Sequence, residues 1–357
     1  MTKPSKDILR RGKINVMIDG QFGSTGKGAL AAYIGHHYNI DLAISNASPN
    51  AGHSFDLNDG KGTRVCTHLP VSGVLNPNAQ IYICAGAIID PIILKREMEK
   101  FQCRERVLIH PRAVIVTDEH TRLEQDKNAG TTKLASTQKG VGAALAGKIM
   151  RQGNTVLARD YFPQKMISIV PVHEYIDKKA MLFMEVPQGL GLSINHGYSF
   201  PHCTSRDVTV AAALNDAGCH PNDLGAVIAS FRSFPIRVGH IYDEKNQIIG
   251  HSGPFWPDSQ ETTFESFNLP PEYTTVTKRK RRIATFSHAQ YGYALHTLRP
   301  DTVFINFMNY FETDKEAQSF VKQLVQTEKQ YGIYPQKLYG YGPSLSDIQS
   351  TPEFASL

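Results

Sequence analysis

The sequence predicts an α/β fold in which a mostly parallel central sheet is flanked by helices. Residues 14–18 are mostly apolar and β-branched, a glycine-rich turn follows at 20–28, and residues 29–34 favour a helix. Further apolar runs alternate with helical segments along the chain, which is typical of such a sheet. With 357 residues, 41% of them hydrophobic and 20% charged, the chain can bury a sizeable core.

Short apolar runs predict the remaining strands, because β-branched and aromatic residues favour extended backbone. These strand candidates are residues 41–45, 81–86, 107–110, 114–116, 181–186, 224–231, 302–307 and 337–339. Helices are predicted at 91–101, 143–152 and 314–331, the last with Thr313 placed to cap it. No repeat or long linker divides the chain, so we expect residues 1–357 to form a single domain with helices on both faces of one sheet.

Composition and charge exclude several classes of protein. A formal net charge of +5 is modest for 357 residues and argues against a general polyanion binder. The five cysteines are far apart, which argues against a disulfide framework or a zinc site and fits a reducing cytoplasm. The basic N-terminus leads into a strand rather than a signal segment. The sequence contains no stretch of about 18 apolar residues, so it predicts no membrane span. We therefore expect a cytoplasmic protein with no membrane or nucleic-acid partner.

The glycine-rich turn has the sequence Gly-Ser-Thr-Gly-Lys-Gly at residues 23–28. Such a turn directs backbone N–H groups and a helix N-terminus at one point, which suits a phosphate. It is not a regular Walker A motif, because its first glycine is one place too early and Lys27 precedes Gly28 rather than serine or threonine. Taken alone, the turn is as consistent with a structural role as with a phosphate site.

Three further loops carry polar residues. Residues 46–54 follow a strand and contain His53, which by itself is also typical of a solvated surface loop. Residues 187–191 leave a nearly continuous apolar strand, and ligands of open α/β sheets collect at such carboxyl ends. Residues 130–142 are rich in hydroxyls and glycine and are expected to form a loop that can close over an anion.

A run of five cations, residues 278–282, stands out from the otherwise mixed charge. Such a run is usually a solvated surface segment, and it can also be a nuclear-localisation or nucleic-acid patch. A third interpretation is a loop that binds a small dicarboxylate through guanidinium groups, which needs only two of the five.

Together these motifs resemble the adenylosuccinate synthetase family. The resemblance runs from about residue 14 to residue 343 and rests on segments 21–28, 50–54, 68–73, 188–189, 196–197, 204–205 and 279–282. It implies a fold related to P-loop NTPases and a ligase that joins aspartate to the 6-position of a purine nucleotide, using a nucleoside triphosphate and Mg²⁺. The γ-phosphoryl group would move to the purine 6-oxygen, and the aspartate amine would then displace phosphate. It also implies a homodimer with shared active sites.

The resemblance assigns expected roles residue by residue. Catalysis is expected from Ser24, Lys27, Gln188 and His53, the last beside the transferring phosphoryl group, where an imidazolium can neutralise charge or donate a proton. The phosphate donor is expected to contact Gly23, Ser24, Thr25, Gly26, Lys27, Gly28, Asn50, Ala51, Gly52, His53, Ser54, Asn306, Asn309, Gly342 and Pro343. The purine monophosphate is expected to contact Ser24, Asn50, Ser136, Thr137, Gln188, Thr204 and, from the neighbouring subunit, Arg151. The aspartate carboxylates are expected at Thr277, Arg279 and Arg281, and Mg²⁺ at Ser24 and the Gly52 carbonyl.

Ser24 departs from the family pattern, which has an aspartate here as the base for the purine N1 proton and as a magnesium ligand. A serine cannot be that base at neutral pH and is a weaker ligand for Mg²⁺. The form Gly-Ser-Thr-Gly-Lys-Gly resembles a phage branch of the family that acts on dGMP and makes the succino precursor of 2-aminoadenine. A shorter side chain leaves room for the guanine 2-amino group and can accept its hydrogen bond. Asp19 is a hypothetical replacement base.

A second departure lies at residues 306–309, Asn-Phe-Met-Asn, where ordinary members have a Lys-x-Asp pair whose carboxylate binds the guanine of GTP. Phe307 and Asn309 remove both charges. ATP or dATP is therefore the expected donor, with its adenine near Phe307 or Asn309.

The leading hypothesis is a ligase that condenses dGMP with L-aspartate to N6-succino-2-amino-2'-deoxyadenylate, using ATP or dATP and Mg²⁺. In a phage-encoded protein it would act in the host cytoplasm. The alternatives are an ordinary adenylosuccinate synthetase acting on IMP, a catalytically silent nucleotide- or DNA-binding homologue, and a generic P-loop NTPase. The choice between deoxyribose and ribose, and between ATP and dATP, does not follow from the residues.

Overall fold

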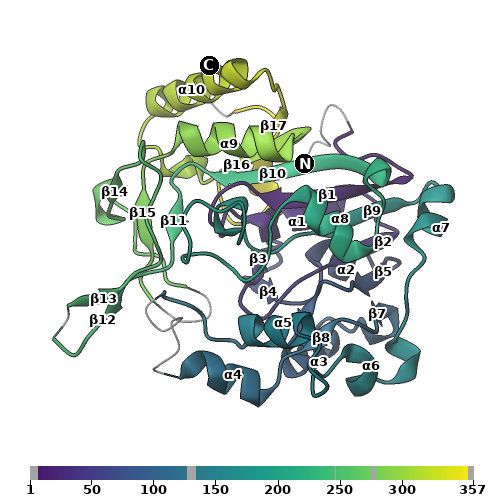
Figure 1. Ribbon diagram of the computed structural model, residues 1–357. Coiled ribbons are helices and arrows are strands. Elements are labelled where there is room, and N and C mark those ends of the chain that lie inside the picture. The colour runs from purple at the N-terminus through teal and green to yellow at the C-terminus, as the bar shows by residue number, and fades with distance from the viewer. Residues whose placement is uncertain (1–6, 127–133, 246, 275–278, 353–357) are drawn as a thin grey trace.

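The computed structural model describes residues 7–126, 134–245, 247–274 and 279–352 (Figure 1). Within these residues the main sheet has nine strands, and every neighbouring pair is parallel except β17 with β18 at one edge. The predicted fold class, a mostly parallel central sheet flanked by helices, is confirmed. The strand order is β18 (Ile348–Gln349), β17 (Gln336–Gly340), β16 (Thr302–Asn306), β10 (Leu224–Arg232), β1 (Lys13–Asp19), β9 (Met181–Glu185), β2 (Leu42–Ser45), β5 (Gln80–Ile83) and β7 (Val107–Ile109).

Smaller sheets accompany the main one, so the expectation of one sheet was wrong. The strand expected at 114–116 is β8, which pairs with β6 outside the main sheet because Val114 and Ile88 pack with Val141 in a separate apolar cluster. The small sheets of the described residues are β3 (His53–Phe55) with β4 (Arg64–Cys66), β6 (Ile88–Ile89) with β8 (Val114–Ile115), β12 (Ile241–Tyr242) with β13 (Ile248–Gly250), and β11 (Ile236–Arg237) with β15 (Arg282–Ala284) and β14 (Glu261–Thr262).

Helices cover both faces of the main sheet, as expected. Side chains of α1, α2, α3 and α6 belong to one buried cluster, and those of α8, α9 and α10 belong to the other. The α-helices of the described residues are α1 (Lys27–His37), α2 (Val71–Leu75), α3 (Pro91–Lys100), α4 (Asp118–Gln125), α5 (Val141–Ile149), α6 (Ala158–Tyr161), α7 (Val172–Asp177), α8 (Val210–Ala217), α9 (His288–Leu298) and α10 (Asp314–Tyr331).

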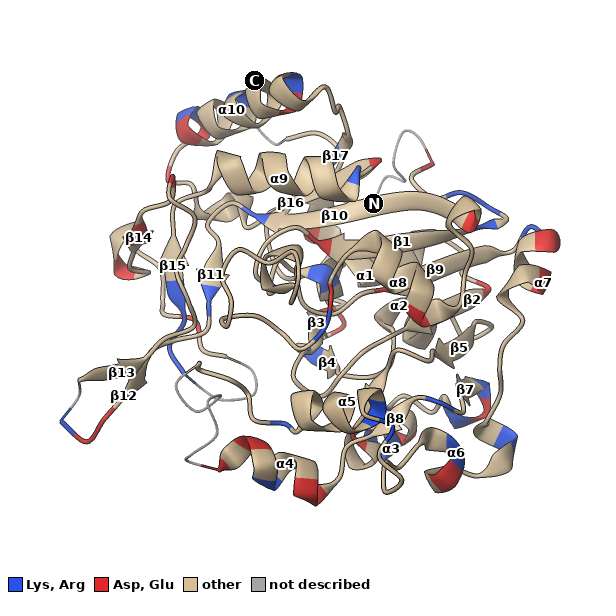
Figure 2. Cartoon of the chain, in the orientation of Figure 1, with Lys and Arg blue, Asp and Glu red and all other residues tan. Residues whose placement is uncertain are grey.

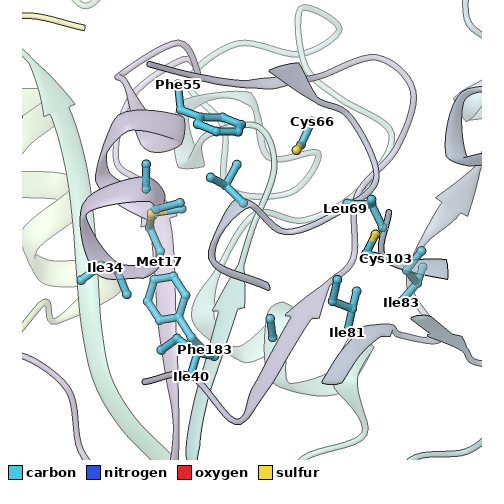
Figure 3. Close-up of a cluster of buried hydrophobic side chains, with 14 of the residues drawn as sticks. Met17, Ile34, Ile40, Phe55, Cys66, Leu69, Ile81, Ile83, Cys103 and Phe183 are labelled. Carbon is cyan, nitrogen blue, oxygen red and sulfur yellow. The ribbon is translucent and has the colours of Figure 1, made fainter. Parts of the chain in front are cut away.

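The central strand β1 shows how the sequence divides between these two clusters. Ile14, Val16 and Ile18 point to the cluster of α8–α10, and Met17 points to the cluster of α1. Figure 3 shows Met17 packed with Ile34 of α1 and with neighbouring strand residues. Successive side chains of a strand point to opposite faces, so a strand buried on both sides is mostly apolar. The buried polar residues of β1, Asn15 and Asp19, are hydrogen-bonded.

Most predicted elements are present, with shifted ends that have local causes. The helix expected at 143–152 is α5, which ends at Ile149 before Arg151 takes a positive φ of 56°. The strand expected at 302–307 ends at Asn306, because Phe307 has a φ of 62° and leaves the extended conformation. Helix α9 was missed because it packs beneath α10 and buries most of its surface, so its sequence has no clear polar face.

Residues of both charge signs lie along the helices α4, α6 and α10 (Figure 2). In the part of the chain that the structure describes, no helix is both long and apolar enough to span a bilayer.

His68 is a fully buried histidine in the segment between β4 and α2. Its Nε2 accepts a hydrogen bond from the Asp90 backbone N–H at 3.1 Å, which requires the neutral ring. Burial lowers the pKa of His68 to about 4, and the charge of Arg206 acts in the same direction. An unfolded histidine titrates near 6.5, so the unfolded chain binds more protons between these two pH values.

We therefore predict that His68 makes unfolding pH-dependent. Its contribution is fully present above pH 6.5 and is lost as the pH falls from 6.5 towards 4, by about 3 kcal/mol in all. In His68→Gln an amide oxygen can replace Nε2 as the hydrogen-bond acceptor, but the side chain no longer titrates. Denaturant unfolding from pH 7.5 to 4.5 should show the native protein and this variant converging as the pH falls. The exposed His173→Gln is the matched control, and a gap between native protein and His68→Gln that stays constant with pH would contradict the prediction.

Candidate functional site

A cavity of about 750 Å³ opens at the carboxyl ends of the central strands. Four strands of the main sheet end there in polar residues: β1 in Asp19, β9 in Glu185, β10 in Arg232 and β16 in Asn306. Each of these side chains is at most 4% exposed. Parallel strands bring their carboxyl ends to the same edge of a sheet, so residues distant in sequence meet there.

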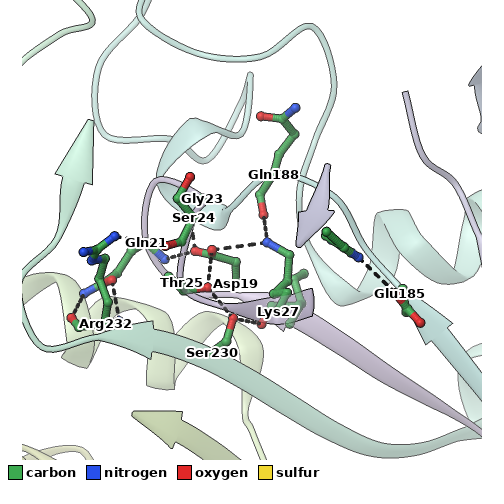
Figure 4. Close-up of polar contacts among 12 residues, drawn as sticks. Asp19, Gln21, Gly23, Ser24, Thr25, Lys27, Glu185, Gln188, Ser230 and Arg232 are labelled. Atoms are coloured by element: carbon green, nitrogen blue, oxygen red, sulfur yellow. Dashed lines mark hydrogen bonds and ion pairs between the residues drawn. The ribbon is translucent and has the colours of Figure 1, made fainter. Parts of the chain in front are cut away.

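The glycine-rich turn is held from beneath by the carboxylate of Asp19. Its Oδ1 accepts hydrogen bonds from the backbone N–H of Gln21 at 2.7 Å and of Gly23 at 3.4 Å. Its Oδ2 accepts from the Thr25 hydroxyl at 2.6 Å and from the Lys27 ammonium at 3.2 Å (Figure 4). One buried carboxylate thus fixes the turn and orients its lysine.

This arrangement argues against the hypothesis that Asp19 is the replacement base. Four donors already occupy its two oxygens, and the side chain is fully buried. Asp19 is also not among the described residues that line the cavity. A carboxylate held in this way stabilises the turn and has no oxygen left for a substrate proton.

Close backbone approaches explain two glycines of the turn. A Cβ on Gly26, whose φ is 86°, would lie 1.9 Å from Nδ2 of Asn306. A Cβ on Gly28 would lie 2.0 Å from the carbonyl oxygen of Ser54. These glycines let the turn lie directly against β16 and against the segment that carries His53.

His53 is oriented by a buried carboxylate from another strand. Its Nδ1 lies 2.9 Å from Oε2 of Glu185, and Oε1 of Glu185 accepts from both the backbone N–H and the hydroxyl of Ser72 at 2.8 Å. Because a carboxylate only accepts, Nδ1 of His53 carries a proton. Nε2 of His53 has no hydrogen-bond partner among the described residues, and the side chain lines the cavity. The histidine is therefore set to offer Nε2 to a ligand.

Four described residues of the cavity wall have backbone conformations that are uncommon outside glycine, among them Ala135 with a φ of 53°. Ser24, Gln188 and Phe307 have φ values of 57°, 67° and 62°. The carbonyl of Gln188 accepts from the Lys27 ammonium at 2.7 Å, and its side chain lies with that of Ser24 on one side of the buried ion pair (Figure 4). Strained backbone of this kind concentrates at functional sites.

The far end of the cavity is lined by Asn306, Phe307, Asn309, Gly342 and Pro343. These residues include the two positions that depart from the family pattern. The guanidinium of Arg232 lies 3.7 Å from the centre of the Phe307 ring, so one face of this ring is already covered. An adenine near Phe307 is left with the other face or the ring edge.

The structure brings most of the expected site residues to this one cavity, and among the described residues it leaves Arg151 and Arg279 out of the lining. Arg151 is exposed just after α5, and Arg279 is partly buried in the irregular segment that precedes β15. Thr277 lies outside the described residues. The expected residues that line the cavity are Gly23, Ser24, Thr25, Gly26, Lys27, Gly28, Asn50, Ala51, Gly52, His53, Ser54, Ser136, Thr137, Gln188, Thr204, Arg281, Asn306, Asn309, Gly342 and Pro343.

Acidic residues neutralise much of the basic run. Lys280 pairs with Glu265 at 2.7 Å and Arg282 with Glu261 at 2.5 Å. Burial lowers the pKa of Arg281 to about 10, and Glu272, 4.0 Å from its Nε, opposes this shift. A nucleic-acid patch needs free cations on one surface, so these pairs disfavour that interpretation.

Sequence reasoning missed the buried charges that hold these groups. Glu185 lies 132 positions from His53, and Glu272 lies 40 positions from Arg232. The strand ending in Glu185 was recognised, and an acid at the end of an otherwise apolar strand is the signal that could have identified it. Glu272 has no such signal, since it stands in an irregular segment rich in proline.

The family model described as adenylosuccinate synthetase matches residues 16–169 and 157–322, which is most of the chain. The chain belongs to the adenylosuccinate synthetase family. Members of this family are ligases that form carbon–nitrogen bonds, and the glycine turn, His53 and Gln188 described above are the parts of its motifs that face the cavity.

Comparison with individual members of the adenylosuccinate synthetase family adds detail. The N6-succino-2-amino-2'-deoxyadenylate synthase of Salmonella phage PMBT28 is 33% identical over 94% of this chain and 97% of its own. The adenylosuccinate synthetase of Pyrococcus sp. (strain ST700) is 27% identical over 93% of this chain and 97% of its own. The succinoaminodeoxyadenylate synthetase of cyanophage S-2L, solved with dGMP and with dATP as energy donor, superposes with a TM-score of 0.84 at 32% identity, covering 97% of each chain.

The contact of Gly28 with Ser54 predicts that this family-motif glycine cannot be replaced. In Gly28→Ala the new methyl would meet the Ser54 backbone at 2.0 Å, so α1 and β3 must separate. We expect a loss of about 3 kcal/mol in unfolding free energy, measured by denaturant unfolding. Gly153→Ala is the control, because nothing lies within 4 Å of its Cβ, and it should stay within about 0.5 kcal/mol of the native protein. Equal stability of the two variants would contradict this account of the turn.

Proposed function

We propose that this member of the adenylosuccinate synthetase family condenses dGMP with L-aspartate, forming N6-succino-2-amino-2'-deoxyadenylate with ATP or dATP as phosphate donor. The observation that carries the proposal is Ser24, an exposed hydroxyl on the cavity wall at the position where the family has an aspartate. The similar phage synthases support the same substrate. The γ-phosphoryl group moves to the purine 6-oxygen, and the aspartate amine then displaces phosphate from carbon 6.

Ser24 favours a 2-aminopurine for a steric and a polar reason. Guanine carries an amino group beside N1, and the hydroxyl of serine is smaller than a carboxylate and can accept a hydrogen bond from that amine. A pocket built around the amine disfavours hypoxanthine, since one unpaired buried polar group costs on the order of 1–3 kcal/mol. The side chain of Gln188, on the same side of the turn, is the neighbouring group for the purine edge.

The donor end of the cavity supports adenine. The described residues that line this end, Asn306, Phe307, Asn309, Gly342 and Pro343, include no carboxylate to accept the paired donors of guanine. The Asn309 amide can both donate and accept, as the adenine edge requires. A donor site without affinity for guanine also keeps the guanine substrate out.

The phosphoryl group in transfer would lie between Lys27 and His53. Lys27 supplies a positive charge at the start of α1, where backbone N–H groups also point. His53 offers Nε2, and the Glu185 carboxylate, which accepts from Nδ1, fixes the orientation of the ring. Such a set neutralises charge that develops on the phosphoryl oxygens, which is the main task of a phosphoryl-transfer site.

Mg²⁺ fits this site as a metal held mainly by the donor phosphates. Glu124 and Glu272 line the cavity, but Glu124 accepts from three backbone N–H groups of residues 140–143 and Glu272 is paired with Arg232. The described residues contain no cluster of three acidic, histidine or cysteine side chains that could hold a metal. The hydroxyl of Ser24 and the carbonyl of Gly52 would be the protein ligands. When bound, Mg²⁺ neutralises the triphosphate and aligns its γ-phosphoryl group.

The remaining ligand contacts would come from cations of the basic run and of a second subunit. Arg281 and Arg279 would bind the aspartate carboxylates, and Nη1 of Arg279 is buried without a hydrogen-bond partner among the described residues. Arg151, exposed and outside this cavity, would reach the nucleotide phosphate of a second subunit, which makes a homodimer part of the proposal. In a phage-infected cell the enzyme would act in the host cytoplasm.

A substrate panel tests the proposed function. With Mg²⁺, ATP or dATP and L-aspartate, we expect aspartate-dependent phosphate release with dGMP at a kcat/KM about tenfold or more above that with IMP. GTP should be a poor donor. Ser24→Asp should shift the preference towards IMP, and Ser319→Asp on the outer face of α10 should not. Turnover of IMP alone, or a preference unaffected by Ser24→Asp, would refute the proposal.

The contact of Glu185 with His53 gives a second test. In Glu185→Gln the carboxylate that accepts from Nδ1 of His53 is lost and the ring is held less firmly, so kcat should fall roughly 10- to 100-fold while the KM for dGMP changes less than about twofold. Steady-state phosphate release measures both constants. Glu105→Gln, whose carboxylate is exposed and paired with Lys165, is the control and should keep native kcat. Native kcat in Glu185→Gln would exclude this role for the carboxylate.

A further inference from the structure

Arg232 is a buried arginine that the proposed reaction leaves without a role. It is the last residue of β10, and its side chain is 1% exposed. Its guanidinium contacts three segments that line the cavity, namely the glycine turn, the donor end and the segment before the basic run. Under the proposed function, each of these segments serves a different ligand.

On the aspartate side, Arg232 forms a two-bonded pair with Glu272. Its Nη2 donates to Oε1 at 2.6 Å and its Nη1 to Oε2 at 3.3 Å. The Tyr310 hydroxyl also donates to Glu272 Oε1 at 2.7 Å, and the backbone carbonyl of Glu272 accepts from the Arg281 N–H at 2.8 Å. Burial would raise the pKa of Glu272, but the charge and hydrogen bonds of Arg232 hold it below its usual value. Glu272 thus fixes the backbone that carries Arg281.

On the donor side, the same guanidinium lies over two aromatic rings. It is 3.7 Å from the centre of the Phe307 ring and 5.6 Å from that of Tyr310. A lysine at position 307, as in ordinary members of the family, would place a second positive charge against Arg232. The aromatic ring at this position and the buried arginine are therefore mutually compatible.

Arg232 also contacts the glycine turn. Its Nη1 donates to the carbonyl of Ser24 at 3.3 Å, and Ser24 is one of the residues with positive φ. A lysine could not make these contacts together, because they use the fork of the guanidinium and its flat face at the same time. Glu272 is partly buried, and among the described residues its ion-pair partners are Arg232 and Arg281. Without the charge of Arg232, Arg281 would be the one described cation left to pair with it.

We propose that Arg232 is a positioning residue that couples the donor site to the aspartate site. A donor base packed against Phe307 restricts the ring and the guanidinium stacked on it, and the guanidinium holds Glu272 and the Arg281 backbone in place for the aspartate carboxylates. Because such coupling is reciprocal, bound aspartate must tighten donor binding by the same factor. This inference rests on the proposed function for the identity of the two ligands.

Calorimetric titration tests the coupling without requiring turnover. The full-length protein, saturated with dGMP and Mg²⁺, is titrated with a non-hydrolysable ATP analogue with and without saturating L-aspartate. In the native protein we expect aspartate to lower the Kd of the analogue about fivefold or more. In Arg232→Lys this ratio should fall below about twofold. Tyr310→Phe, which keeps the buried ion pair and serves if Arg232→Lys fails to fold, should give an intermediate ratio.

Arg106→Lys is the matched control. Arg106 donates to the backbone carbonyls of Gly73, Asn76 and Ala79, away from the cavity, so this variant should lower the Tm and keep the native ratio. The coupling would be overturned if aspartate left the Kd of the analogue unchanged in the native protein. It would also be overturned if Arg232→Lys and Tyr310→Phe both showed the same change in Kd as the native protein. Failure of the proposed function would instead show as no aspartate-dependent phosphate release from the native protein with dGMP.

Discussion

The buried carboxylate of Asp19 is the constraint on which the site depends. A buried carboxylate is costly unless its oxygens are hydrogen-bonded, and here backbone N–H groups, the Thr25 hydroxyl and the Lys27 ammonium satisfy it. The turn can close only around this group, and in closing it presents its other N–H groups and α1 towards the cavity. The close contacts of Gly26 and Gly28 then bring β16 and the His53 segment against the same turn.

The same principle recurs at the ends of the neighbouring strands. Glu185 holds His53, and Arg232 holds Glu272, each through a buried charge at the last residue of a strand. These charges are paired within the protein and are not among the described residues that line the cavity, so they orient the residues that face it. Preorganisation of this kind is what phosphoryl transfer needs, because its transition state is stabilised by fixed charges and dipoles.

The departures from the family pattern are concentrated where the two nucleotide bases would lie. Ser24, Phe307 and Asn309 are neutral, whereas Lys27 and Arg281 retain their charges near the expected phosphate and aspartate positions. Under the proposed function, the chemistry of the family is therefore preserved while both expected base sites lack the carboxylates of the family pattern. Under the proposed function, these changes exchange the roles of the nucleotides, with guanine as substrate and adenine in the donor.

The sequence by itself determined the fold class, most strands of the sheet, and the glycine turn with His53, because these depend on local patterns of apolar residues, glycine and motif spacing. Only the tertiary structure decided that Asp19 supports the turn rather than acting as a base, that Glu185 orients His53, and that Arg232 contacts three segments of the wall. The physical reason is that burial is set by neighbouring strands rather than by the local sequence. The donors of Asp19 are local but its burial is not, and Glu185 and Arg232 meet partners 132 and 208 positions away at one edge of the sheet.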